Sequence, residues 1–406
     1  MVAHTLQPRK QQRRRTTRGT RLMFPHLRLL MVDLLPDAEY NPPQDHGGRD
    51  GVYVTLNAPI YASADSLRRT CADILKAAGV RPQEAALIAD CLVYANLRGV
   101  DTHGVIRLKF YLQRIQAGGD NPRAEIKIIR ESPTTALLDA DNAFGPVAGT
   151  RAMDMAIAKA RDCGLGAVAI RNANHFGAAA YYAQRPLRDG MIGICIANVV
   201  ASMPPPGGRA ARVGNSPIAF AFPSGDEPPV IFDAATSVAP WGALIEARLR
   251  GEQLPPDSFL DREGRPTRDP QAVLDGGFLM PIAGHKGYGL SLSIALMTGL
   301  LAGGVFDIDI TYPYGDVSIP GNNSFLMIAL RVDCFGALDE YIRRMDEVIR
   351  LIRATPTIEG VDRVLLPGQR EHETALERSR TGIPLSSELV AELQDLAASV
   401  GLTIEL

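Results

Sequence analysis

The amino-acid sequence predicts an α/β protein whose folded part has helical segments at both ends. Three observations lead to this class. Short apolar runs typical of strands alternate with helix-like runs through the middle of the chain. The composition, with 46% hydrophobic and 22% charged side chains in 406 residues, allows a large buried core. Helical periodicity precedes the alternating region and returns near the C-terminus.

Four segments can be distinguished along the chain. Residues 1–55 begin with an Arg-rich stretch and contain no acidic residue before Asp33, so we expect a disordered basic extension. Similar starts also occur in transit peptides and in basic arms that contact nucleic acid. We expect residues 60–130 to form a helical segment that packs with the C-terminal part, and residues 131–320 to form the α/β core. A strand and helices from residues 321–406 are expected to complete the first lobe.

The N-terminal segment is expected to contain three helices. Apolar residues at spacings of three and four predict the first over residues 66–79, with Ser66 as a candidate cap. The second, over residues 82–99, begins with a proline, which suits a first helical turn. The third is expected over residues 101–117, where a Gly-Gly pair follows.

The middle of the chain then alternates between strand-like and helix-like runs. In order, these are "TALLDA", "AMDMAIAKARDC", "GAVAIR", "AAYYAQRPLRDG", "MIGICIAN", "PIAFAFP" and "PVIFDAATS". The later run "GLSLSIALMTGLLAGG" is too short and too rich in Gly and Ser to span a bilayer, so we interpret it as a buried helix. A strand is predicted at "SFLMIALRV", and helices over residues 340–352 and 387–400.

Charge and cysteine content restrict the classes of function. The formal net charge of −2 gives no sign of nucleic-acid or membrane binding, so a small molecule is the expected partner. The five cysteines are widely spaced among apolar residues, which predicts free buried thiols rather than disulfides or a metal knuckle. Free thiols favour a reducing compartment, and we expect the protein in the cytoplasm.

The stretch "RGVDTHGVIRL" is the first candidate for chemistry. If Asp101 or Thr102 caps the third helix, His103 lies in the first turn, where the helix dipole keeps its imidazole neutral. Arg107, four residues on, shares its face. A neutral histidine beside a guanidinium suits a substrate whose carboxylate adjoins a carbonyl or hydroxyl group. The alternative is a backbone-bonded histidine and a solvated arginine.

Two further stretches place polar groups at the ends of predicted strands. In "AIRNANHFGAAAYYA", Asn174 and His175 lie at a turn between a strand and a helix, where α/β proteins place active sites. The alternative is a turn that only satisfies the helix start. In "PVIFDAATS", Asp233 emerges from an apolar strand. Its carboxylate could orient a histidine, act as the catalytic acid or bind a cofactor hydroxyl. The alternative is that it caps the residues that follow.

A glycine-rich stretch, "IAGHKGYGLSLSIAL", precedes a helix. Its glycines and Lys286 describe an anion or phosphate site at a helix N-terminus, with a plain glycine-rich turn as the alternative. It lacks the spacing of a Walker A loop. Residues 164–169 match the dinucleotide pattern G-x-G-x-x-A, but they follow a helix and enter a strand, so they are not a Rossmann loop.

Metal binding is a competing use of the same side chains. His103, His175, His285 and Asp233 are ligand types for zinc or iron. No two of these histidines have helical ligand spacing and no cysteine joins them. We therefore expect no metal site.

Together, and in this order, these stretches resemble one family. The stretches are "ANLRGVDTHGVIRL", "RNANHFGAAAYYA", "PPPGGRAARVGNSPIAFAFP", "FDAATSVAPWG", "LDREGRPTRDP", "GHKGYGLSLSIALMTGLLAGG", "VLLPGQRE" and "GIPL". They are similar to the malate/L-lactate dehydrogenase family of the second type, which also contains ureidoglycolate, sulfolactate and diketogulonate enzymes and piperideine and pyrroline carboxylate reductases. The resemblance implies an NAD- or NADP-dependent oxidoreductase with a non-Rossmann, mixed-sheet α/β fold, in which residues 131–320 bind the cofactor. It also implies a homodimer whose site draws on both subunits.

The resemblance also implies roles for individual residues. His103 and Asp233 match a proposed proton-transfer pair, and His175 matches the proton acceptor of some members. Arg107 matches the arginine that binds the substrate carboxylate, and Asn174 is expected to bind substrate beside it. The implied cofactor contacts are Asp233, Ala234, Ala235, His285, Lys286 and Gly287.

The chain departs from the family pattern at two positions. Ala173 stands where the family often has Ser, and Ala243 stands where Lys usually follows Trp-Gly. The first change affects the surroundings of His175 and bears on substrate preference. The second removes a charge that bears on cofactor contacts.

We therefore expect an enzyme that interconverts a small 2-oxo acid and a 2-hydroxy acid with NAD or NADP. Arg107 holds the substrate carboxylate, and His103 or His175, supported by Asp233, transfers the proton. A cyclic-imine or ketimine reductase is the alternative within the family. A metal-dependent lyase or hydrolase is the alternative from another class.

Overall fold

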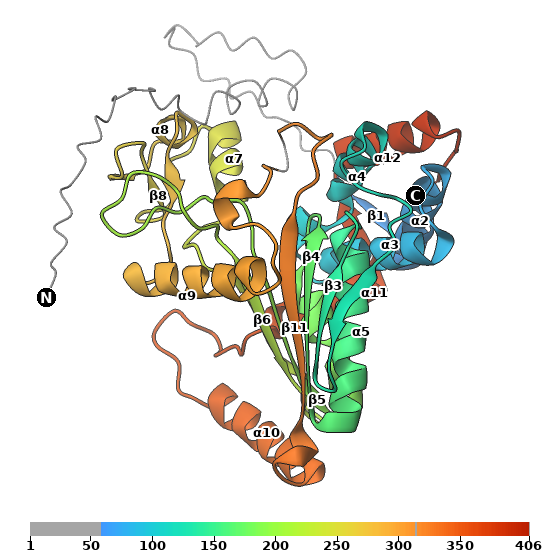
Figure 1. The fold of residues 1–406 in the computed structure, drawn as a ribbon. Coiled ribbons are helices and arrows are strands. Elements are labelled where there is room, and N and C mark those ends of the chain that lie inside the picture. Colours follow the sequence, from blue (N-terminus) through green and yellow to red (C-terminus); the bar gives the residue numbers. More distant parts are fainter. Residues whose placement is uncertain (1–57, 313–314, 406) are drawn as a thin grey trace, which may run out of the picture.

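The structure is a computed structural model that describes residues 58–312 and 315–405 (Figure 1). The basic extension predicted over residues 1–55 lies outside the described residues and stays a prediction. Within the described part, no helix combines the length and the apolar character that crossing a membrane requires.

A seven-stranded mixed sheet forms the centre of the molecule, which confirms the predicted fold class. Its strand order is β2-β3-β4-β11-β5-β6-β7. Only β3 and β4 pair in parallel, and every other neighbouring pair is antiparallel. The strands are β2 (Lys127–Glu131), β3 (Thr135–Asp139), β4 (Leu165–Ala173), β5 (Met191–Ala197), β6 (Pro217–Phe222), β7 (Val230–Ala235) and β11 (Asn323–Arg331).

Helices cover both faces of this sheet. α5 (Gly145–Cys163) connects β3 to β4 and lies on one face, while α9 (His285–Ala295) lies on the other side (Figure 1). On α5, a stripe of alanines repeats every four residues and is fully buried, which brings the helix close to the strands. The stripe consists of Ala148, Ala152, Ala156 and Ala160. On the opposite face, Ile294 of α9 packs with Ala169, Ile196 and Leu326 of the sheet.

The position of β11 differs from the predicted organisation. Residues 321–406 were expected to complete the first lobe, yet β11 lies between β4 and β5 in the middle of the large sheet. A boundary at residue 320 therefore cuts through the central sheet. Strand order depends on pairing between distant segments, and the local pattern of "SFLMIALRV" carries no information about its neighbours.

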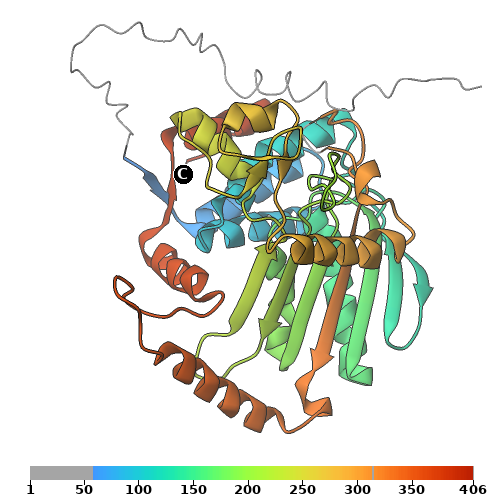
Figure 2. The same ribbon diagram turned by 90° about the vertical axis from the view of Figure 1, so that its left-hand side faces the viewer.

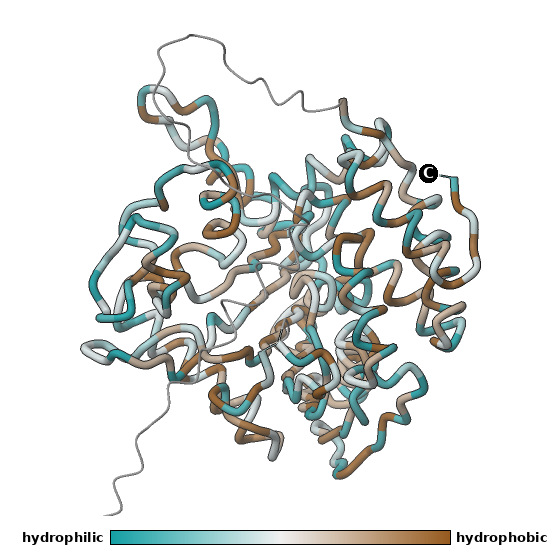
Figure 3. The backbone as a smooth tube through the Cα atoms, turned by 90° about the horizontal axis from the view of Figure 1, so that it is seen from above, coloured by the Kyte–Doolittle hydropathy of each residue, from teal (hydrophilic) through white to brown (hydrophobic). Residues whose placement is uncertain are grey.

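A helical lobe joins the first and last described segments. β1 (Ile60–Ala62) pairs with β12 (Ile383–Leu385), and both lie in one apolar core with the lobe's helices. These helices are α2 (Ala64–Ala77), α3 (Pro82–Leu97), α4 (Leu108–Ala117) and α12 (Ser387–Ser399). α2 is capped by Ser63, whose side chain accepts from Ser66 N, so the predicted cap at Ser66 is three residues late. Seen from above, hydrophilic and hydrophobic residues alternate along single helices (Figure 3). This alternation is typical of a helix that packs against the protein on one side only.

The remaining elements form a smaller unit and the sheet's far end. The smaller unit holds α7 (Trp241–Arg250), α8 (Pro270–Leu274), β8 (Phe259–Leu260), β9 (Pro266–Thr267) and β10 (Phe278–Leu279) around its own apolar cluster. α10 (Leu338–Arg353) crosses the lower end of the strands, and α11 (Gln369–Thr381) lies beside the sheet (Figure 2). Short elements are α6 (Ala179–Ala183), the 3-10 turns η1 (Asp101–His103), η2 (Val105–Arg107), η3 (Arg185–Asp189), η5 (Asp307–Asp309) and η6 (Val332–Cys334), and the π turn η4 (Leu296–Leu300).

Two expectations about burial are wrong in part. The helix expected to be buried, α9 with η4, exposes several large apolar side chains on this chain, up to 64% for Leu301. Cys71, Cys91 and Cys195 are buried as expected, but Cys163 and Cys334 are exposed. All five cysteines are free.

Candidate active site

A cavity of about 690 Å³ opens where several strands of the large sheet end. β4, β5 and β7 run in the same direction and finish there, while β6 and β11 begin there. The carboxyl ends of strands are the usual ligand site of α/β proteins. Six predicted site residues line this cavity: His103, Asn174, His175, Asp233, Ala234 and Ala235.

His103 reaches the cavity from a turn, and the helix predicted over residues 101–117 is wrong in its first half. The 3-10 turns η1 and η2 occupy that half, and α4 begins only at Leu108. Between the turns, a Cβ on Gly104 would lie 2.2 Å from Asn96 Oδ1, so only glycine fits. Val105 N donates to the same oxygen at 2.8 Å. This long-range hydrogen bond replaces a bond within a continuous helix.

The imidazole of His103 is nevertheless neutral at pH 7. Burial, together with the nearby charge of Arg107, lowers the pKa of His103 to about 4. The helix dipole, which was the predicted cause, does not act because no regular helix begins there. Thr102 Oγ1 lies 3.1 Å from Nδ1 and orients the ring.

Arg107 lies close enough to the two histidines for its charge to act on both, but it is not among the residues that line the cavity. Its Nε donates to Thr102 O at 2.6 Å, which ties the guanidinium to the turn that carries His103. Burial lowers the pKa of Arg107 from its ordinary value, which is so high that the group stays charged at pH 7. Its charge in turn lowers the pKa of both His103 and His175. The predicted carboxylate contact stays a prediction.

His175 follows β4 in the predicted strand, turn and helix arrangement. Its ring stacks on that of His103, with centroids 5.8 Å apart and an interplanar angle of 16°. The Tyr111 hydroxyl lies 2.9 Å from His175 Nδ1. A Cβ on Gly145, at the start of α5, would lie 2.0 Å from the His175 carbonyl oxygen, so the backbone of the turn is held closely.

The surroundings of His175 also favour its neutral form. Burial is the main cause that holds its pKa well below the usual value, and the charges of Arg107, His103 and Arg114 act in the same direction. The cavity therefore presents two stacked neutral imidazoles with the charge of Arg107 nearby, while the second guanidinium, that of Arg114, pairs with Asp120. Such a site can accept a proton from a hydroxyl group and can attract an anion.

Asn174 braces the cavity wall. Its Oδ1 accepts from Arg114 Nη2 at 3.0 Å and from Gly321 N at 2.7 Å, and its Nδ2 donates to Asn142 O at 2.7 Å. Only 1% of the residue is exposed. These bonds occupy both ends of the amide, and the predicted contact between Asn174 and the substrate stays a prediction.

Asp233 faces the cavity from β7. Its Oδ2 accepts from Ala180 N at 2.7 Å, so it caps α6, and the alternative that it caps the residues after it is wrong. The carboxylate is open to the cavity but surrounded by protein, and this burial raises the pKa of Asp233 to about 6. In the described part of the chain, neither His103 nor His175 hydrogen bonds to Asp233.

The residues of the predicted anion site form the start of α9 and lie outside the cavity lining. His285, Lys286 and Gly287 form the first turn of α9, after Gly284 with a φ of 62°. The predicted glycine-rich helix start is therefore correct. These three residues do not line the cavity, so their cofactor contacts stay predictions.

One wall of the cavity was not predicted from the sequence. It is the segment that leads into α11, namely Leu365, Leu366, Pro367, Gly368, Arg370 and Glu371. Its sequence, within "VLLPGQRE", carried a detectable signal, because a Pro-Gly pair before a helix exposes the free N–H groups of a first helical turn. Arg98 lines the same part of the cavity.

The lining fits a nicotinamide dinucleotide. A helix N-terminus with Arg98 and Arg370 suits the negatively charged phosphates. The small side chains of Ala234 and Ala235 leave room in the cavity for a flat ring. The donor set therefore matches the chemistry of the group that the resemblance implies.

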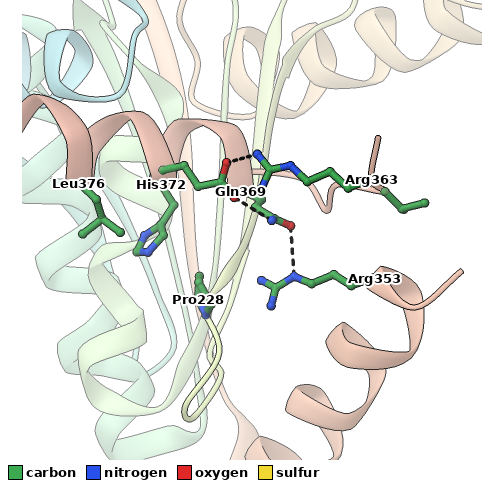
Figure 4. A pocket seen from close by; sticks show the side chains of 8 residues that line it. Pro228, Arg353, Arg363, Gln369, His372 and Leu376 are labelled. Atoms are coloured by element: carbon green, nitrogen blue, oxygen red, sulfur yellow. Dashed lines mark hydrogen bonds and ion pairs between the residues drawn. The ribbon is translucent and has the colours of Figure 1, made fainter. Parts of the chain in front are cut away.

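A second cavity, of about 370 Å³, lies outside the sheet between α10 and α11 (Figure 4). Arg353 and Arg363 point into it, but Arg353 pairs with Glu227 and Arg363 pairs with Glu373. Their charges are therefore largely neutralised. His372 is the only histidine in its lining. We assign no role in catalysis to this cavity.

Comparisons with known proteins show which family the chain resembles. The family model described as malate/L-lactate dehydrogenase matches residues 62–394. A malate dehydrogenase from Pyrococcus abyssi is 38% identical over 335 residues, which is 81% of this chain and 91% of the relative. The sulfolactate dehydrogenase structure from Methanocaldococcus jannaschii has a TM-score of 0.80 at 33% identity, over 85% of this chain and 98% of that one. The Δ1-piperideine-2-carboxylate reductase structure from Pseudomonas syringae pvar. tomato has a TM-score of 0.76 at 29% identity, over 83% of this chain and all of that one.

The match covers most of the chain, and the relatives compared are dehydrogenases or reductases rather than lyases or hydrolases. Another relative, from Escherichia coli O157:H7, is named ureidoglycolate dehydrogenase (NAD(+)) and is 33% identical over 80% of this chain and 93% of that relative. The chain belongs to the malate/L-lactate dehydrogenase family and is an NAD(P)-dependent oxidoreductase.

Proposed function

We propose that this protein interconverts a small 2-oxo acid and the corresponding 2-hydroxy acid in the cavity beside β4 and β7. The observation that carries the proposal is the stacked pair of imidazoles, 5.8 Å apart, with the Arg107 charge beside them. A guanidinium binds a carboxylate, and a neutral imidazole accepts the proton of an adjacent hydroxyl group. A 2-hydroxy acid carries both groups on neighbouring carbons.

In this proposal His175 transfers the proton. Arg107, which does not line the cavity in this structure, turns toward it to bind the substrate carboxylate. When bound, a nicotinamide coenzyme would accept the hydride from C2 of the substrate during oxidation and would donate it during reduction. During oxidation, the hydroxyl O–H bond breaks, His175 accepts the proton and the carbonyl group forms. During reduction, the imidazolium of His175 returns the proton to the carbonyl oxygen. His103 stacks on His175 and restricts its ring to one plane.

The first test is a coenzyme assay on the full chain. NADH and NADPH absorbance is followed with pyruvate, oxaloacetate and a longer 2-oxo acid. We expect turnover with at least one 2-oxo acid and one coenzyme. Coenzyme binding without turnover of any 2-oxo acid contradicts the proposed substrate class, and absence of coenzyme binding contradicts a functional oxidoreductase site.

A cyclic-imine reductase is the second candidate. The structural similarity to a Δ1-piperideine-2-carboxylate reductase supports it. The C=N carbon of such a substrate also carries a carboxylate, so the same arginine and histidine suit it. Piperideine-2-carboxylate and pyruvate with methylamine, added to the assay, separate the two candidates: faster turnover of the imines than of the 2-oxo acids favours the reductase.

We also propose that the protein forms a homodimer through α9 and η4. Five large apolar side chains are exposed on these elements and on the residue directly after η4, with exposed fractions from 38% to 64%: Leu290, Leu296, Met297, Leu300 and Leu301. Exposed apolar patches of this kind mark interaction surfaces. A second copy of the chain is the partner that the family resemblance implies.

The dimer proposal predicts the effect of charges on this surface. Light scattering is expected to give twice the chain mass of 43.8 kDa for the unmodified protein. The double variant Leu300→Lys, Leu301→Lys should lower the mass toward one chain, because burying an unpaired ammonium group is costly. Leu351→Lys, at an even more exposed position on α10, is the control. A monomeric unmodified protein, or dissociation only in the control, contradicts the proposal.

A further inference from the structure

We propose that Tyr111 is a positioning residue, which binds Nδ1 of His175 from behind the cavity wall and leaves Nε2 for proton transfer. The inference rests on the proposed function for the role of His175. The two side chains come from different segments, α4 and the turn after β4, and their contact is 2.9 Å long. The Tyr111 hydroxyl contacts His175, and only 1% of the residue is exposed, so its role is to position His175 and not to bind the substrate.

The phenol ring of Tyr111 has little freedom to move. Only 1% of the residue is exposed. The ring meets Phe144 edge to face, with centroids 5.5 Å apart, and meets Phe110 at 5.9 Å. Phe110 also stands perpendicular to the His175 ring at 6.2 Å. The hydroxyl group is therefore held at a fixed point beside the imidazole.

The contact determines which imidazole nitrogen remains for chemistry. Among the described residues, the Tyr111 hydroxyl makes no other hydrogen bond, and neither does the His175 ring. When the hydroxyl oxygen accepts from Nδ1–H, the lone pair of Nε2 is free to act as a base. When Nε2 has taken a proton, Nδ1–H keeps the same acceptor. One contact thus serves both directions of the reaction without movement of the ring.

The Tyr111 hydroxyl also takes the place of the carboxylate that often orients a histidine base. Histidine bases are often oriented by an acidic group, but Asp233 is engaged with Ala180 and does not reach the ring. The charged and titratable groups that act on His175 are His103 of η1, Arg107 of η2 and Arg114 of α4, and all three disfavour its protonation. The Tyr111 oxygen is then the acceptor that stabilises the imidazolium.

The variant Tyr111→Phe tests this role because it removes one oxygen atom from a tightly packed ring. We expect kcat to fall about 10- to 100-fold, as when an orienting partner of a histidine is removed, with KM and coenzyme affinity unchanged. Loss of the acceptor should also lower the pKa of His175, so the acidic limb of kcat/KM for hydroxy-acid oxidation should move to lower pH. Tyr181→Phe is the matched control, since it loses a tyrosine hydrogen bond to Asp90 Oδ2 of 3.0 Å outside the cavity lining.

A measurement without turnover separates this inference from the proposed function. Nitrogen-15 NMR of histidine rings reports which nitrogen carries the proton, and His175→Gln identifies the His175 signals. We expect a single tautomer with Nδ1 protonated in the unmodified protein and a mixture in Tyr111→Phe. Unchanged ring signals, or a kcat as high as that of Tyr181→Phe, would overturn the role of Tyr111. If the unmodified protein turns over no substrate, the proposed function fails while the NMR test still applies.

Discussion

Replacing His175 with glutamine is expected to lower kcat for 2-oxo acid reduction by about 10²- to 10⁴-fold, because proton transfer by a positioned side chain contributes that much to rate. Glutamine keeps a polar side chain of similar reach at the end of β4 but cannot exchange a proton near neutral pH. Coenzyme affinity should change little. Stopped-flow single-turnover measurements should place the loss in the chemical step rather than in product release.

The matched variant is His103→Gln, on the other ring of the stacked pair. Its kcat should fall less than that of His175→Gln, because His103 in the proposal restricts the neighbouring ring and does not exchange the proton. A larger loss in His103→Gln would reverse the assignment and make His103 the proton-transfer group. Thermal unfolding of both variants controls for a general loss of structure.

The low histidine pKa values also predict an unusual pH dependence. Oxidation of the hydroxy acid requires a neutral imidazole, so activity is present above the pKa and is lost as pH falls through it. Burial and Arg107 hold the pKa of His103 at about 4 and that of His175 well below its ordinary value. kcat/KM for oxidation should therefore stay level from about pH 8 to about pH 6, where a histidine of ordinary pKa, about 6.5, would already lose activity. A midpoint near that ordinary value would contradict the proposed surroundings of the base.

Local sequence patterns were sufficient for the parts of the site that lie at strand ends. His175 and Asp233 follow apolar runs whose length and flanking turns identify strands, and both line the cavity. The glycine-rich start of α9 could be predicted for the same reason, because positive φ angles and helix starts leave a local signature. What each of these residues contacts could not be predicted.

Contacts between distant segments account for the errors. The predicted third helix breaks at Gly104 because Asn96, on the preceding helix, fills the space of a side chain. The predicted contact of Asn174 with the substrate stays a prediction, but its bonds from Arg114 and Gly321 could not be predicted from its place in a turn. Tyr111 follows the apolar periodicity of a helix, so its pattern indicates a core residue and not a partner of His175. In each case the chemistry depends on a pairing that periodicity does not report.

Replacing Arg107 with methionine is expected to reduce kcat/KM for the acid substrate by about 30- to several thousand-fold. Losing one partner of a buried, hydrogen-bonded charge pair costs about 2–5 kcal/mol, which corresponds to this range. The cause is the loss of the guanidinium that binds the carboxylate. The affinity for the coenzyme, measured by fluorescence titration, should stay nearly unchanged. An equal fall in substrate and coenzyme affinity would rule out a role specific to the substrate.

Arg107→Lys distinguishes charge from geometry at the same position. Lysine keeps the positive charge but cannot form a bidentate pair with a carboxylate, so substrate affinity should remain well below that of the unmodified protein. The pH profile should respond differently in the two variants. Because the Arg107 charge lowers the pKa of both His103 and His175, methionine should raise these pKa values and move the acidic limb of the oxidation profile to higher pH, whereas lysine should largely preserve it. A pH profile unchanged in both variants would mean that the charge of Arg107 does not act on the proton-transfer histidine. The substrate carboxylate and that histidine would then lie in separate parts of the cavity.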